Sequence, residues 1–215
     1  HFGSLEVLKG VDRSGEAGEI ISIVGASGAG KTTLLQIRGT LEQAEPGASL
    51  LIEGEEVAQL SERRLAELRC RRLGFIFQSF NLVPTLTAAE NITLPLDIAR
   101  KKVNPQRFDQ VIDAVGLRER LSHRPAELSG GQVQRVACAR ALVGEPAVGF
   151  ADEPTGNPAS HSTEQVREIL RRSVVSLKQS VVMVTHDPEG AHWADTIHIL
   201  RDGQDVAGTA DPTRV

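Results

Sequence analysis

The sequence predicts an α/β protein with a parallel sheet at its core and a mostly helical insertion between two strands of that sheet. Three observations lead to this prediction: a phosphate-binding motif, a set of short apolar runs, and a stretch over residues 79–128 where strand signals disappear. The chain has 215 residues, of which 40% are hydrophobic. It is therefore long enough to form one large domain, or a core domain with an insertion.

The phosphate-binding motif is the most specific feature of the chain. It reads Gly-Ala-Ser-Gly-Ala-Gly-Lys-Thr-Thr and matches the pattern G-x-x-x-x-G-K-[ST] without departure. Its glycines let several backbone N–H groups converge on one anion at the positive end of a helix. Lys31 supplies a point charge for the β- and γ-phosphates, and the Thr32 hydroxyl can bind Mg²⁺. The predicted phosphate contacts are Gly25, Ala26, Ser27, Gly28, Ala29, Gly30, Lys31, Thr32 and Thr33.

Short apolar runs predict the strands of the sheet, because strands that are buried on both faces are continuously apolar. In chain order these runs cover residues 5–11, 20–24, 48–52, 73–77, 146–151, 180–185 and 196–200. Apolar spacing typical of helices follows the phosphate motif and covers residues 62–68, with Ser61 as the expected N-cap, and residues 160–172. The tail from Ala207 carries no clear signal.

The insertion differs from the rest of the chain because helical patterns there alternate with prolines. Its first loop, residues 80–86, carries several large apolar side chains, which either pack internally or form a groove for a partner helix. Near its end, Ser129 and two glycines precede the helical pattern marked by Val133 and Val136. Such a start exposes N–H groups, and behind a phosphate loop it suggests a second phosphate contact.

Polar side chains stand at the ends of two predicted strands, where sheets of this class bind ligands. Asp152 and Glu153 follow one strand, and His186 follows the next. Adjacent strand positions point in opposite directions, so the two carboxylates should do different work. We expect Asp152 to hold Mg²⁺, mostly through water, and Glu153 to polarise the attacking water. His186 can reach a γ-phosphate from its strand end, although a single histidine is more often structural.

The composition of the chain argues against some classes of binding partner, nucleic acid above all. With a net charge of −4 and 3% aromatic residues, the chain shows no basic field or stacking platform for nucleic acid. Cys70 and Cys138 have no metal or redox spacing and indicate reduced thiols. No apolar run reaches the ~18 residues of a membrane helix, so a membrane role would come through a partner. Because the chain begins with His1, we expect a fragment that lacks a few N-terminal residues.

Together these motifs make the chain resemble the ATP-binding subunit of an ATP-binding-cassette (ABC) transporter over essentially its whole length. The family's phosphate loop, Q-loop, signature, Walker B motif and switch histidine match, in order, residues 25–32, Gln78, residues 128–132, residues 147–153 and His186. Residues 75–96 and 151–157 look like the lipoprotein-release and macrolide-export branch. Residues 2–10 look equally like polar amino-acid importers, and we favour the first branch.

The resemblance implies an architecture. It is a P-loop NTPase core with a parallel sheet, plus an antiparallel β subdomain and an inserted α-helical subdomain. The core would comprise residues 1–78 and 147–215, and the helical and signature insertion would cover about residues 79–146.

The resemblance also implies an ATPase that uses ATP and Mg²⁺. Two copies would enclose two ATP molecules, each on one copy's phosphate loop and under Ser129, Gly130, Gly131 and Gln132 of the other. Glu153 would act as base, with His186 and Gln78 beside it, and Thr32, Gln78 and Asp152 would serve the metal. Phe2 would stack on adenine. An integral-membrane permease would hold the dimer at the cytoplasmic face of the membrane.

Several positions depart from the family pattern. Pro158 and Ala159 stand where an aspartate normally crosses the dimer interface, Gly149 replaces a bulky strand residue, and Arg38 puts a charge on a face that is usually apolar. Arg13 and Ser14 interrupt a segment that is normally a strand. Ala159 keeps an alternative open, in which the chain regulates a membrane complex through ATP without transport.

Overall fold

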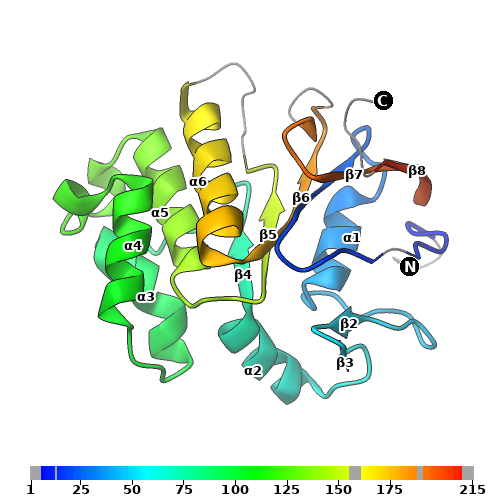
Figure 1. Cartoon of the computed structure of the whole chain (residues 1–215). Coiled ribbons are helices and arrows are strands. Elements are labelled where there is room, and N and C mark those ends of the chain that lie inside the picture. The colour runs from blue at the N-terminus through cyan, green and yellow to red at the C-terminus, as the bar shows by residue number, and fades with distance from the viewer. Residues whose placement is uncertain (1–5, 13, 155–160, 188–190, 210–215) are drawn as a thin grey trace.

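The computed structural model describes residues 6–12, 14–154, 161–187 and 191–209 (Figure 1). Its main sheet has the strand order β4-β5-β6-β1-β7-β8. All neighbouring strands in it are parallel except β7 and β8, which form an antiparallel hairpin. The strands are β1 (Ile20–Val24), β4 (Leu73–Ile76), β5 (Val148–Asp152), β6 (Ser180–Thr185), β7 (Thr196–Arg201) and β8 (Gln204–Thr209). Consequently β1, β5 and β6 end at one edge of the sheet.

Helices cover both faces of this sheet, with α1 on one face and α6 and the helical insertion on the other (Figure 1). The side chains of β1 show the division: Ile20 and Val24 join one buried cluster, and Ile21 and Ile23 join the other. The helices are α1 (Lys31–Arg38), α2 (Glu62–Arg72), α3 (Ala88–Ile98), α4 (Pro105–Val115), α5 (Gly130–Leu142) and α6 (His161–Leu177), with short 3₁₀ turns at Arg118–Arg120 and Pro125–Glu127.

Two strands coincide with the sequence prediction in both bounds, β1 and β6. Both are buried almost throughout, so the apolar runs define them fully. A separate antiparallel pair, β2 (Leu51–Ile52) and β3 (Glu55–Glu56), confirms the expected second sheet. Its turn residues Glu53 and Gly54 both have positive φ, at 50° and 79°, as a tight two-residue hairpin requires.

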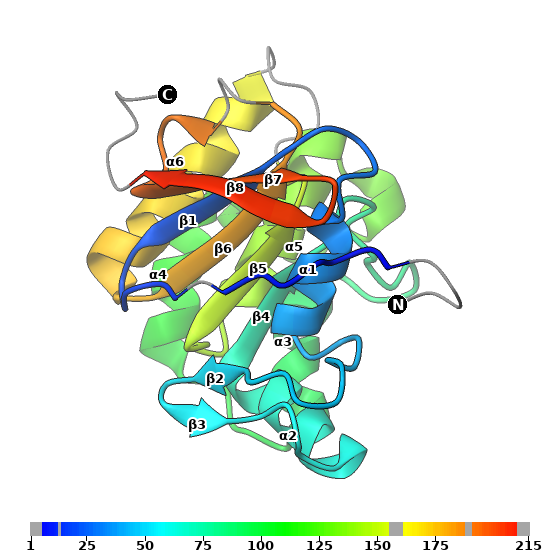
Figure 2. The same cartoon turned by 90° about the vertical axis from the view of Figure 1, so that its right-hand side faces the viewer.

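The predicted strand over residues 5–11 is wrong for the described residues 6–11, which form no strand. The segment instead crosses close to the start of α1, and its Lys9 N–H donates to Gly203 O at 2.8 Å (Figure 2). Gly10, with φ of 76°, turns the chain away before a ladder can form. The strand over residues 48–52 is also shorter than predicted, and β8 was missed.

The helical insertion is confirmed, because α3, α4 and α5 all lie between the adjacent strands β4 and β5. Its first loop packs internally around Asn91, whose side chain is 0% exposed. The Asn91 side chain accepts from Val83 N–H at 2.8 Å and donates to the carbonyls of Val83, Leu86 and Thr87. Leu82 packs against the main buried cluster, so this apolar side chain of the loop contributes to the fold.

Arg38 and Gly149, which differ from the family pattern, are both accommodated by the fold. Arg38 is partly buried at the end of α1, and this burial lowers the pKa of its guanidinium while the charge of Asp205 opposes the shift. A Cβ at Gly149 would lie 3.8 Å from Ser180 O, an ordinary contact distance. Position 149 therefore does not require glycine. Pro158, Ala159 and Arg13 lie outside the described residues.

Candidate functional site

The loop between β1 and α1 forms the floor of the site. Gly30 is the N-cap of α1, with φ of 97°, and no side chain caps this helix. The first N–H groups of a helix have no acceptor within it, so this start suits an external anion. A Cβ on Gly25 would lie 2.2 Å from Leu200 O, which shows how closely the loop rests on β7. Only glycine permits that approach.

Lys31 lies inside the curve of the loop, and the residue is 7% exposed. Its Nζ donates to Gly25 O at 2.8 Å and to Ala26 O at 3.0 Å. The ammonium group is thus held by the main chain of its own loop. It can turn from these carbonyls toward a bound phosphate without leaving the loop.

Thr32 and Asp152 connect α1 to the end of β5. The Thr32 hydroxyl donates to Asp152 Oδ1 at 3.2 Å. Burial raises the pKa of the Asp152 carboxyl, and the charge of Glu153 adds to this, while the bond from Thr32 and the charge of Lys31 act against it. The pair offers the hard oxygen donors that Mg²⁺ prefers.

Glu153 and His186 form a second pair beside the first. The two side chains meet at 2.9 Å, between His186 Nδ1 and Glu153 Oε1. The Glu153 side chain is 14% exposed and that of His186 is 58% exposed, so the carboxylate lies deeper. Glu153 has a φ of 46°, and its N–H donates to Val184 O at 3.0 Å, which fixes it to β6. The adjacent carboxylates of Asp152 and Glu153 therefore have different hydrogen-bond partners, Thr32 and His186.

Lys31, Thr32, Glu153 and His186 surround one cavity of about 380 Å³, which Asp152 does not line. It is lined by Val7, Ser27, Gly28, Gly30, Lys31, Thr32, Thr33, Gln78, Glu153 and His186. The cavity thus brings together residues that are far apart in the sequence: the phosphate loop, Gln78, Glu153 and His186. Val7 was missed by sequence reasoning because an apolar residue near a chain end carries no chemical signal.

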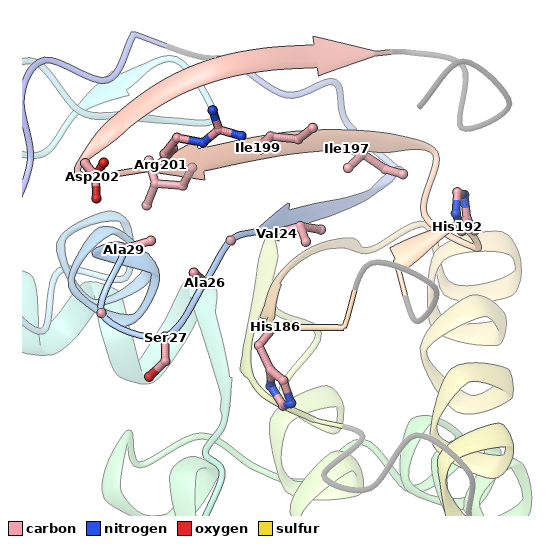
Figure 3. A pocket seen from close by; sticks show the side chains of 13 residues that line it. Val24, Ala26, Ser27, Ala29, His186, His192, Ile197, Ile199, Arg201 and Asp202 are labelled. Atoms are coloured by element: carbon pink, nitrogen blue, oxygen red, sulfur yellow. The ribbon is translucent and has the colours of Figure 1, made fainter.

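A larger cavity of about 560 Å³ also borders the loop (Figure 3). Its lining is mostly apolar and includes Val24, Ile197 and Ile199. Of the predicted site residues, Gly25, Ala26 and Ala29 border this larger cavity and not the smaller one, and Ser27, Gly28 and His186 border both. Lys31 and Thr32 belong only to the smaller cavity, which is therefore the one equipped for a triphosphate.

The start of α5 does not line the smaller cavity of its own chain. Ser129 is the N-cap of α5, its hydroxyl accepts from Gln132 N–H at 3.3 Å, and Gln132 Oε1 accepts from Ser129 N–H at 2.8 Å. Within one chain the structure thus does not bring Ser129, Gly130, Gly131 and Gln132 to the phosphate loop. Phe2 lies outside the described residues.

Further along α5, the buried Gln134 donates to Pro154 O, directly after the acidic pair. This bond ties the helix to the loop that leaves the site, and no sequence pattern suggested it. Among the described residues, no three or more His, Cys, Asp or Glu side chains form a metal cluster. A cation at Thr32 and Asp152 would thus need further ligands from a nucleotide or water.

Comparison with known proteins agrees with this geometry. A family model described as ABC transporter matches residues 8–156. The chain is 48% identical over 204 residues to the lipoprotein-releasing system ATP-binding protein LolD of Porphyromonas gingivalis, covering 94% of this chain and 93% of LolD. It is 44% identical to the macrolide export ATP-binding/permease protein MacB of Brucella melitensis, covering 97% of this chain and 33% of MacB.

A solved structure with a similar fold is the dimeric ATP-binding cassette MJ0796 in a post-hydrolysis state with ADP and Pi. Its TM-score is 0.84 at 36% identity, over 94% of this chain and 90% of that one. Within the described part of our chain, no helix is both long and apolar enough to span a membrane.

Proposed function

The chain belongs to the ABC transporter family, and from this we propose that it hydrolyses ATP to power a membrane permease that exports a lipophilic, lipoprotein-like or drug substrate. The observation that supports this best is the convergence of Lys31, Thr32, Glu153 and His186 on one cavity. The names of LolD and MacB support the export branch. We place the chain at the cytoplasmic face of the membrane, held there by its permease.

The residues of the cavity would divide the work of hydrolysis. The N–H groups at the start of α1 and Lys31 would hold the triphosphate. Thr32, Asp152 and Gln78 would hold Mg²⁺, which neutralises phosphate charge when bound. Water would attack the γ-phosphorus as the bond to the β-γ bridging oxygen breaks, and Glu153 would accept the water's proton. His186 would orient the Glu153 carboxylate and contact the γ-phosphate.

A second copy would complete the site, because α5 of the same chain does not reach it. The solved cassette MJ0796 is dimeric. We propose that Ser129, Gly130, Gly131 and Gln132 of one copy approach the ATP on the other copy's phosphate loop. The nucleotide-binding core would comprise residues 1–78 and 147–215, and the helical and signature part about residues 79–146.

Steady-state hydrolysis by the parent and by Glu153→Gln tests the proposal. The variant keeps the size of the side chain but removes the proton acceptor, so hydrolysis should fall by about 10²–10⁴-fold while ATP still binds. Glu119→Gln, at an exposed glutamate in a 3₁₀ turn, is the matched control and should hydrolyse ATP like the parent. A parent no faster than Glu153→Gln would remove the enzymatic role.

A further inference from the structure

Gly203, in the turn between β7 and β8, contacts two segments that are remote from it in sequence. Its N–H donates to Ala29 O, in the phosphate loop, at 3.1 Å. Its carbonyl accepts from Lys9 N–H, in the N-terminal segment, at 2.8 Å. One residue outside every recognised motif therefore joins the phosphate loop to the chain that passes over it. Figure 3 shows the neighbouring Asp202 beside Ala29.

The contact with the N-terminal segment requires glycine at this position. Gly203 is buried and has a φ of 78°, in the left-handed region. A Cβ there would lie 2.0 Å from Val7 O and 2.9 Å from Val7 C. Both atoms belong to the backbone, so a side chain could fit only if the N-terminal segment moved away from the turn.

The N-terminal segment in turn forms part of the nucleotide cavity. Val7 lines the cavity together with Gly30, Lys31 and Thr32. The Val7 Cγ1 atom lies 3.3 Å from where a Cβ of Gly30 would be, so Val7 packs directly on the start of α1. The proposed function puts the γ-phosphate at Glu153 and His186, whereas Val7 is an apolar side chain of the same cavity beside Gly30.

We propose that Gly203 is a positioning residue for nucleotide binding, which fixes the distance between the phosphate loop and the apolar surface at Val7. This inference rests on the proposed ATP-binding function. The two hydrogen bonds of Gly203 hold both segments to the same turn of the β7–β8 hairpin. A nucleoside triphosphate then meets a site in which the phosphate-binding and nucleoside-binding parts are already spaced for it.

Gly203→Ala tests the proposal, with Gly54→Ala as its matched control. Gly54 has nearly the same φ, 79°, but a Cβ there meets nothing within 4 Å. Both variants thus introduce the same backbone strain, and only Gly203→Ala displaces the N-terminal segment. Binding of MgATP and of magnesium tripolyphosphate, which lacks a nucleoside, should be measured by calorimetry for each.

Gly203→Ala should weaken MgATP binding about tenfold and leave tripolyphosphate binding nearly unchanged, because the phosphate loop keeps its own N–H groups. In hydrolysis, KM for ATP should rise while kcat stays within about twofold. Gly54→Ala should leave the ratio of the two affinities at the parent value. A purely structural role of Gly203 would weaken both ligands alike, and an unchanged ratio would therefore overturn the proposal.

If Gly203→Ala does not fold, Lys9→Pro serves instead, because it removes the N–H that Gly203 O accepts. It should shift the ratio of affinities in the same direction, and an unchanged ratio would again overturn the positioning role. A parent chain that bound neither ligand would overturn the proposed function itself. A parent that binds MgATP while both variants keep its ratio would overturn only the role of Gly203.

Discussion

Helices α1 and α5 each have a glycine at their start, as the N-cap Gly30 of α1 and as the first residue Gly130 of α5, but their first turns are built differently. Helix α1 starts behind Gly30 without any side-chain cap. Helix α5 starts with Gly130 behind Ser129, which forms a complete capping box with Gln132. The first start opens into the triphosphate cavity, whereas the second does not line it.

This difference between the starts of α1 and α5 decides which of them has backbone N–H groups available for a phosphate. An uncapped start leaves N–H groups for an anion, and the Lys31 charge lies beside them. At α5 the cap already satisfies the N–H of Gln132, so mainly the N–H groups of Gly130 and Gly131 remain for a ligand. Among the described residues, the uncapped start of α1 is therefore a stronger phosphate cradle than the capped start of α5, and our proposal has α5 contribute when a second copy approaches.

Lys31→Ala should have the largest effect on the α1 side of this comparison. It removes a charge that can form two or more charge-assisted hydrogen bonds to phosphate, so ATP affinity should fall by about 10²–10³-fold. Calorimetry at a fixed Mg²⁺ concentration measures this, with Lys102→Ala at an exposed position as control. Equal affinities of Lys31→Ala and the parent would show that the α1 start is not the cradle.

Ser129→Ala tests the α5 side, and Thr87→Ala is its matched control because Thr87 caps α3 with the same kind of capping box. Each variant should lose about 1 kcal/mol in free energy of unfolding, measured with urea. Only Ser129→Ala should also lower hydrolysis, by about tenfold, if its hydroxyl meets the partner's ATP. Equal rates of ATP hydrolysis in both variants would show that Ser129 only caps the helix.

The raised pKa of Asp152 predicts a pH dependence that belongs to the α1 side. Mg²⁺ needs the carboxylate, so Mg²⁺-dependent ATP binding should weaken as pH falls through this raised pKa, at a higher pH than an ordinary aspartate would cause. The free energy of unfolding depends on pH in the opposite direction to Mg²⁺-dependent binding. The folded form prefers the protonated acid, so the contribution of Asp152 to the free energy of unfolding is lost as pH rises through the folded pKa.

Asp152→Asn should remove both effects. Its unfolding free energy relative to the parent should therefore increase as pH rises through that window. Urea unfolding across a pH series measures this change. A constant difference between the two proteins at every pH would contradict the assignment.

The smallest expected effect is on cysteine modification. The reactivity of Cys138 shows whether α5 stays folded as a rigid helix when MgATP binds. Cys138 lies in the buried part of α5, where burial raises the pKa of its thiol to about 12. Iodoacetamide should therefore modify the partly exposed Cys70 and spare Cys138, with and without MgATP. Modification of Cys138 only with MgATP would instead indicate that α5 unwinds when its start meets a ligand.

The parts of the fold that the sequence predicted best are those whose side chains decide the structure alone. Strands β1 and β6 are mostly apolar and, apart from the partly buried Ser180, buried throughout, so their bounds could be predicted. Strand β8 is mixed in polarity and exists because it pairs with β7 across a tight turn. The segment at residues 6–11 has strand-like residues, but the left-handed backbone of Gly10 interrupts the extended conformation and, among the described residues, only the backbone bond from Lys9 N–H to Gly203 O is formed with the β7–β8 turn.

The candidate site divides in the same way. Residue type, the phosphate motif and the position at strand ends predicted Lys31, Glu153 and His186 as site residues, and these three line the smaller cavity. The roles that we propose for Val7 and Gly203 come only from close approach in space, and no local pattern encodes such an approach. The contacts that we propose for the residues after Ser129 involve a second copy, which no pattern within one chain describes.

Complementation between two defective chains tests most directly whether α1 and α5 serve one ATP from different copies. The first carries Lys31→Ala. The second carries Gly130→Glu: a Cβ at this position meets nothing within 4 Å, and a carboxylate suits a helix N-terminus but repels phosphate. Each alone should be inactive, and an equal mixture should recover up to about a quarter of the parent hydrolysis, since half of random pairs are mixed and each holds one intact site. A mixture as inactive as its components would contradict the shared site.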